Sequence, residues 1–298
     1  MSPSTANDRV LPELPTELTD VIIDHLHNDK LSLRNCALVS NAWLNSSRYH
    51  LFYAIRVRGE LPRRSFTDFV IFIGSTPRIR DHIRELTFRI NGGLASQPPA
   101  IRCVGPYIFA SVLKSLPMLR AISLNNISWD RNLITGPDER AVQVWPPVPR
   151  ALDTLTLSRV VTEEFLTQRI FRLNDLVELF FAFSPLRTMR ALGMTLELNS
   201  QDPALQVLPE KLHLRELQLH SNYARIPLTP VLDAIHSKMA KHLRKLSAVV
   251  RNDGEASVLG NILRGIGSTL EELRLDHSDL TVLRAFSTPL PALPSAAR

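Results

Sequence analysis

The chain has 298 residues, of which 44% are hydrophobic and 21% are charged, an ordinary balance for a globular protein with a sizeable core. No apolar run approaches the roughly 18 residues of a membrane-spanning helix, and the N-terminus lacks the basic-then-apolar layout of a signal peptide. The chain has only two cysteines, Cys36 and Cys103, so a disulfide framework is not implied. We therefore expect a cytoplasmic or nuclear protein that does not bind a membrane.

The net charge of +6 is unevenly placed along the chain. Residues 1–60 hold six Lys/Arg and seven Asp/Glu, whereas residues 61–298 hold the other 29 and 22. These basic residues stand singly among acids, and no aromatic-plus-basic RNA motif accompanies them. We therefore expect a protein partner and no nucleic acid.

Residues 14–52 predict three short helices. Pro15 suits a first helical position, where its missing N–H costs nothing. Ser32 is a plausible N-cap for a second helix, and residues 41–51 predict a third, which includes Trp43. A segment of this length is too short to bury a good core alone, so we expect it to complete its core against a partner.

This segment resembles an F-box. The family pattern L-P-x-E-L stands at residues 14–18, an aliphatic pair follows at residues 22–23, and V-S-x-x-W stands at residues 39–43. The closing R-Y-H-L-F at residues 48–52 is similar to F-box proteins that are abundant in fungi. The resemblance implies that the segment binds the Skp-type adaptor of a cullin–RING ubiquitin ligase. It implies that the contacts, or the packing immediately behind them, come from Leu14, Pro15, Leu18, Ile22, Leu33, Val39 and Trp43.

The remainder of the chain repeats a short motif, apolar-x-x-apolar-x-apolar. The copies are IRELTF (83–88), LRAISL (119–124), LDTLTL (152–157), a weaker LRTMRA from residue 186, LRELQL (214–219), LRKLSA (243–248) and LEELRL (270–275). Stripes of helical period precede most copies; they begin at Phe66, Ile108, Leu176, Val231 and Val258. One unit is therefore a helix, a tight turn and a short strand, and neither element can bury its apolar face without a neighbouring unit.

This array resembles the irregular leucine-rich repeats of many F-box proteins. The Asn of the fuller repeat pattern appears once, at Asn222, while Ile127, Val160 and Ser278 stand at that place in other copies. A doubly wound α/β domain is the alternative, but it usually has longer strands and a Gly-rich turn, and this chain has only 11 glycines. The expected fold class is α/β, a three-helix F-box followed by an irregular leucine-rich-repeat solenoid with a curved parallel sheet.

We expect four segments: a disordered N-terminus at 1–10, the F-box-like domain at 11–55, the repeat domain at 56–286 and a Pro/Ala/Ser-rich tail at 287–298. Loops are predicted within the repeat domain at 91–106 and 129–150.

In such an array the residues between the apolar motif positions point to the concave face. This face is expected to be mildly basic and to bind the target protein through Arg89, Asn125, Ser158, Arg190, His220, Arg274 and Asp276, with Thr87, Ser123, Thr156 and Gln218 beside them.

The sequence offers no sign of catalysis. It contains no phosphate-binding Gly-rich loop, no Cys-x-x-Cys and no His-x-x-x-His pair, so neither a cofactor nor a metal is expected. Cys36 lies in an apolar helical stripe, so we expect it to be a packed thiol and not a nucleophile. The leading hypothesis is therefore a non-enzymatic substrate-recognition subunit of a Skp–cullin–F-box ubiquitin ligase. The alternative is a repeat scaffold that acts outside ubiquitination.

Overall fold

A computed structural model describes residues 14–59, 65–94, 102–131, 150–166, 170–183, 185–192, 195–197, 213–220, 242–250 and 253–277. The chain divides into two compact units, Met1–Ala54 and Ile55–Arg298, which are treated separately below. The division lies next to the domain boundary expected after residue 55. The expectations for residues 1–10 and 287–298 lie outside the described residues.

Unit 1 consists of three helices, α1 (Thr16–His25), α2 (Lys30–Val39) and α3 (Asn41–Phe52). Pro15 is the N-cap of α1, one position before the predicted one. Asp29 caps α2, and its carboxylate accepts from the backbone N–H groups of Leu31 and Ser32, both at 3.1 Å. The predicted N-cap, Ser32, therefore lies inside the first turn, because the carboxylate three residues earlier takes the capping role.

The core of unit 1 is small. Among its described residues, only Ile23 and Leu33 are buried hydrophobic side chains, and both are 0% exposed. Thr19 and Ser47 are the buried polar residues between the helices. Most apolar side chains of this unit therefore stay in contact with solvent.

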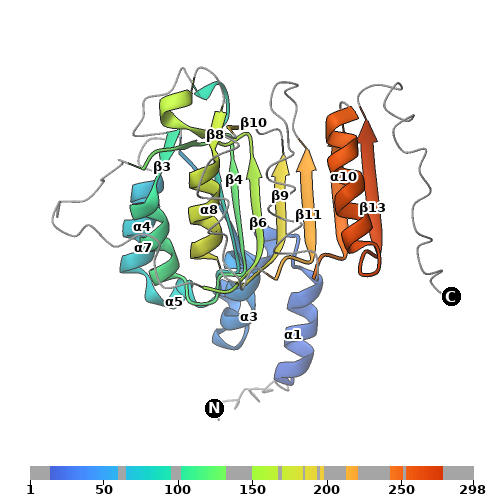
Figure 1. Ribbon diagram of the computed structural model, residues 1–298. Helices are drawn as coiled ribbons and strands as arrows, with labels where there is room; N and C mark the ends of the chain where they lie inside the picture. The colour runs from blue at the N-terminus through green and yellow to red at the C-terminus, as the bar shows by residue number, and fades with distance from the viewer. Residues whose placement is uncertain are drawn as a thin grey trace, which may run out of the picture. The chain divides into compact units, whose positions relative to one another are not determined.

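Unit 2 is built on one eight-stranded sheet whose strands follow one another in chain order (Figure 1). Its strands are β1 (Ala54–Arg58), β2 (Glu85–Arg89), β4 (Ala121–Asn125), β6 (Leu152–Ser158), β9 (Leu186–Leu192), β11 (Glu216–His220), β12 (Lys245–Val250) and β13 (Glu272–His277). Every pair from β2 to β13 is parallel. The seven strands predicted from the motif are thus confirmed, and β1 is an addition.

The register aligns the motifs with one another. Leu86 pairs with Ile122, Ile122 with Leu155 and Leu155 with Met189, so the same motif position recurs across the sheet. These side chains are buried, whereas the alternating ones are half-buried or exposed. One face of the sheet therefore forms the core, and we call the other the open face.

Helices cover the buried face (Figure 1). They are α4 (Phe66–Ser75), α7 (Pro106–Ser115), α8 (Leu173–Ala182) and α10 (Asp253–Ile266), with the one-turn α5 (Pro77–Arg80) after α4. These four long helices match four predicted apolar stripes; the stripe at 231–239 lies outside the described residues. The fold of this unit is α/β with a large parallel sheet.

Two small sheets, which the sequence did not predict, lie beyond the C-terminal ends of the main strands. One contains β3 (Cys103–Val104), β5 (Ser128–Trp129) and β7 (Val161–Thr162), and the other contains β8 (Ile170–Arg172) and β10 (Thr195–Glu197). The prediction of a loop at 91–106 was therefore wrong at its end, since β3 lies there and α7 starts at Pro106. The predicted loop at 129–150 begins on the last residue of β5, and residues 132–149 are not described.

Aromatic side chains connect the layers of unit 2. Phe88 on β2 meets Phe66 of α4 edge-on, with ring centroids 4.9 Å apart. Phe109 of α7 packs edge-on against Trp129 at 5.2 Å and against Phe183 at 6.1 Å. All five rings are buried, and such contacts add about 0.5–1.5 kcal/mol each beyond the burial of their area.

Candidate binding surfaces

The first candidate surface is an apolar stripe along α1 in unit 1. Leu14 is 53% exposed, Leu18 52%, Val21 52% and Ile22 42%. Positions three and four residues apart lie on one side of a helix, so these side chains share a side. The side that carries Thr19 and Ile23 faces inward instead.

Helix α2 carries a second stripe of the same kind. Leu31 is 69% exposed, Val39 70% and Leu38 86%, and their spacing places them on one side of the helix. Leu33 points the other way and is fully buried. Exposing three large aliphatic side chains on one helix forgoes roughly 1.5–3 kcal/mol of burial for each, which a partner would supply.

The residues predicted for adaptor binding divide into three groups. Leu14, Pro15, Leu18, Ile22 and Val39 are exposed, Trp43 is half-buried, and Leu33 has no exposed surface. The structure therefore places Leu33 in the packing behind the surface. Sequence reasoning gave no binding role to Val21, Leu31 and Leu38, although their spacing from Leu14, Leu18 and Val39 could have indicated it.

Polar contacts hold these helices in place. His50 of α3 lies 2.7 Å from the carboxylate of Asp24 on α1, and Ser46 donates to Asp20 on the same two helices. Lys30 of α2 donates to the carbonyl of His50, and burial lowers the pKa of its amine. The two stripes are thus carried by helices that are each tied to α3.

The second candidate surface is the open face of the sheet, where the residues predicted to bind a target fall into two rows. Arg89, Asn125 and Ser158 are directly paired in register. Arg190 instead pairs with Thr156 and Gln218, so it belongs to the row of Thr87, Ser123, Ser247 and Arg274. His220 pairs with Leu192, which pairs with Ser158, and Asp276 ends that row beside Val249. The expected single row is therefore two.

Ion pairs on the open face cancel much of its charge. Arg190 lies 3.3 Å from Glu216, Lys245 2.6 Å from Glu272, and Arg274 3.5 Å from Asp276. His220 hydrogen-bonds Ser247 at 2.8 Å. On the open face of β2 to β13, the basic residues Arg89, Arg190, Lys245 and Arg274 balance the acidic residues Glu85, Glu216, Glu272 and Asp276. The face is polar but electrically balanced, which differs from the expected basic character.

A partly buried polar cluster lies beside the small sheets. The carboxylate of Glu163 accepts from Arg102, from the thiol of Cys103 at 3.3 Å and from the hydroxyl of Ser128. Burial alone would raise the pKa of Glu163, but these hydrogen bonds outweigh it and hold the pKa below its ordinary value. Burial, with the Glu163 charge, raises the pKa of Cys103 to about 12, so this thiol stays protonated and is a poor nucleophile.

A neighbouring carboxylate, Asp175, starts helix α8. It is fully buried, accepts from the hydroxyl of Thr162 at 2.7 Å and pairs with Arg131, which also reaches Glu178 at 3.0 Å. Burial raises the pKa of Asp175, and these partners offset only part of that rise. Every acid of both clusters has a basic or hydroxyl partner. We therefore infer that these clusters hold successive helix–strand repeats of unit 2 together.

No cluster of three or more potential metal ligands occurs among the described residues, and no described helix is long and apolar enough to cross a bilayer. Neither the protein-family models nor the curated proteins searched contain a match to this chain.

Proposed function

We propose that this protein is a substrate-recognition subunit of a Skp–cullin–F-box-type ubiquitin ligase. The exposed aliphatic stripes of α1 and α2 carry the proposal, because they include Leu14 and Leu18 of the L-P-x-E-L motif and Val39 of the V-S-x-x-W motif, which resemble an F-box. A helical unit whose described residues include two fully buried apolar side chains and seven large exposed aliphatic ones gains stability from a partner with an apolar groove. In this proposal the Skp-type adaptor is that partner.

In this proposal, unit 2 supplies the surface that binds the target protein. Its strands follow chain order and its long helices lie on one face, an arrangement that supports an irregular leucine-rich-repeat solenoid. Asn126 lies one position before the place where the repeat pattern has Asn. Its side-chain amide donates to the carbonyls of Ile90 and Gly92 in the preceding repeat, at 3.0 and 2.8 Å. The polar open face, which includes Arg89, Asn125 and Arg274, is left to bind a target protein.

The protein itself would contribute no catalytic group. By holding adaptor and target at once, it raises the local concentration of target lysines near a ubiquitin-loaded conjugating enzyme. This mechanism is consistent with the protonated state of Cys103 and with the ion pairs that engage Glu163 and Asp175.

Co-purification tests the proposal. Tagged full-length protein should recover the Skp-type adaptor and a cullin from cell extract. Leu14→Ala/Pro15→Ala and Leu38→Asp should lose both, since these residues are exposed and their loss leaves the core intact. Asn45→Asp, at an exposed position on α3 and therefore outside both stripes, introduces the same charge as Leu38→Asp; it is the matched control and should retain both.

Three outcomes separate the possibilities. Failure of the wild-type protein to recover any adaptor would refute the proposal. Recovery of adaptor without cullin would favour a scaffold that acts outside ubiquitination. Recovery of both by wild type and by Leu38→Asp alike would show that the α2 stripe is not the contact surface.

A further inference from the structure

A row of charged residues runs along the edge of the main sheet where its strands begin. It is formed by the second residue of each motif, and we call it the edge row: Arg84, Arg120, Asp153, Arg187, Arg215, Arg244 and Glu271. Backbone hydrogen bonds connect neighbours in it, such as Arg120 N–H to the Arg84 carbonyl at 2.7 Å and Asp153 N–H to the Arg120 carbonyl at 2.8 Å. The row is therefore fixed by the register of the sheet.

The edge row is basic, unlike the open face. It holds five arginines and two acids, and those acids pair with Arg187 and Arg244. Among the described residues, Arg84, Arg120 and Arg215 have no ion pair, although Arg84 donates to the carbonyl of Asp81. Like charges on adjacent strands repel one another, so an anionic partner would relieve a cost already present in the fold.

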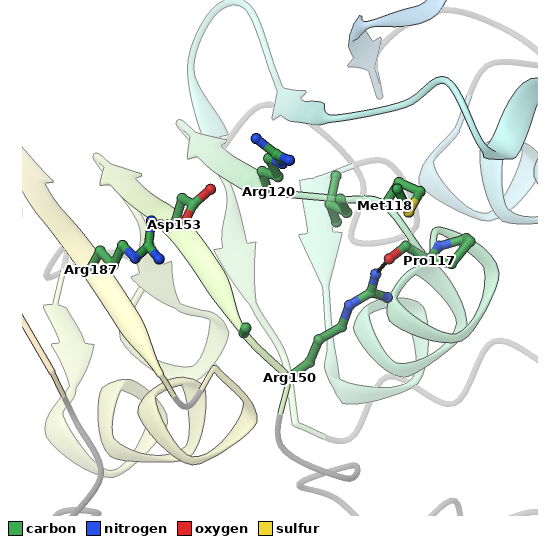
Figure 2. A pocket seen from close by; sticks show the side chains of 8 residues that line it. Pro117, Met118, Arg120, Arg150, Asp153 and Arg187 are labelled. Atoms are coloured by element: carbon green, nitrogen blue, oxygen red, sulfur yellow. Dashed lines mark hydrogen bonds and ion pairs between the residues drawn. The ribbon is translucent and has the colours of Figure 1, made fainter.

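A pocket of about 430 Å³ lies on the row at the start of β4, β6 and β9 (Figure 2). Arg120, Asp153 and Arg187 stand side by side on it, and the half-exposed Met118 adds an apolar wall. Arg150 closes one side; its guanidinium donates to the carbonyls of Leu113 and Pro117. Arg120 and Arg187 are thus the pocket cations that can turn towards a ligand.

The spacing of these cations selects the kind of anion. Arg120 and Arg187 lie two strands apart, roughly 10 Å at the usual strand separation, with the carboxylate of Asp153 between them. One phosphate needs cations that converge on it, and side chains that start two strands apart do not converge. Two separate carboxylates, one on each arginine, fit this arrangement better. In a polyproline II segment, residues three apart share a side and lie about 9.3 Å apart.

We propose that Arg120 and Arg187 form a two-carboxylate subsite that binds an extended segment of the target protein carrying acidic residues three positions apart. The target role rests on the proposed function, but the subsite is a property of this chain alone. Its test uses no adaptor, so its failure and the failure of the proposed function are distinguishable.

The experiment titrates the full-length protein, labelled with ¹⁵N, with short capped peptides and follows the arginine Nε–H signals. The probes are Gly-Glu-Pro-Pro-Glu-Gly, its isomer Gly-Glu-Glu-Pro-Pro-Gly, the uncharged Gly-Gln-Pro-Pro-Gln-Gly and a peptide with one phosphoserine. The first should bind saturably, with a dissociation constant of about 1 mM, and shift the Arg120 and Arg187 signals. The isomer should bind roughly threefold to fivefold more weakly, because only one of its carboxylates can reach an arginine.

Matched variants locate the subsite. Arg120→Gln should weaken binding of the first peptide about threefold to fivefold, whereas Arg264→Gln, an exposed arginine on α10, should not change it. Asp153→Asn should strengthen binding by a similar factor, since it frees Arg187; Asp253→Asn on α10 makes the same change in net charge and should have no effect. Equal binding of the two isomers, equal effects of Arg120→Gln and Arg264→Gln, or binding of the phosphoserine peptide alone would each overturn the proposal.

Discussion

Asn126 lies at the turn after β4, and its substitution separates two contributions to the stability of unit 2. Its backbone has φ of 55°, in the left-handed region, and its amide donates to the carbonyls of Ile90 and Gly92. Glycine accepts this φ freely but removes both hydrogen bonds, whereas alanine removes both and is strained as well.

The magnitudes follow from those two contributions. Two lost hydrogen bonds at about 1 kcal/mol each give about 2 kcal/mol for Asn126→Gly. Strain of about 1 kcal/mol in the left-handed region brings Asn126→Ala to about 3 kcal/mol. Asn125→Ala is the matched control: it lies next in sequence on the half-exposed open face, and it should change the free energy of unfolding by less than about 0.5 kcal/mol.

Urea unfolding measures these differences. In a Trp43→Phe/Trp145→Phe background, Trp129 is the remaining tryptophan of three; it is fully buried in β5, next to this turn. Equal destabilisation by glycine and alanine would refute the role of the backbone conformation. An Asn126→Gly variant as stable as wild type would refute the role of the hydrogen bonds.

Three further predictions concern buried groups. Because hydrogen bonds lower the pKa of Glu163, its carboxylate stabilises the fold above its ordinary pKa of 4.5, and that contribution is lost as pH falls. Glu163→Gln should therefore cost roughly 2–3 kcal/mol at pH 7 and progressively less in acid, measured by urea unfolding from pH 7 to 3. Cys103, with its pKa of about 12, should resist iodoacetamide at pH 8 in the native protein, whereas Cys36, which is half-exposed and not packed as expected, should react, as peptide mass mapping would show. Leu33→Ala should cost about 3 kcal/mol in thermal unfolding, whereas Leu38→Ala should cost less than about 0.5 kcal/mol. Their order would be reversed if α2 faced the other way.

The main sheet could be predicted from the sequence because its signal is local. Apolar residues at the first, fourth and sixth motif positions mark each strand, and the helical stripes before them mark α4, α7, α8 and α10. The small sheets could not be predicted, because strands of two or three residues, such as β3 and β8, are too short to carry an alternating pattern.

The individual ion pairs of the open face could not be predicted from the sequence either. Arg190 and Glu216 are 26 positions apart, and their contact depends on the register of β9 with β11. The basic character of the open face was overstated because the prediction left out the third motif positions, where Glu85, Glu216 and Glu272 stand. The edge row, in contrast, was readable: arginine recurs as the second residue of five of the seven motif copies, from Arg84 to Arg244.

We propose above that unit 1 binds a Skp-type adaptor through its exposed aliphatic stripes. A calorimetric titration of purified adaptor into the full-length protein tests this binding most directly. We predict a one-to-one complex with a dissociation constant below about 1 µM. Leu18→Asp, which would bury a charge in the interface, should weaken it at least about a hundredfold. No detectable heat with the wild-type protein, or unchanged affinity for Leu18→Asp, would contradict it.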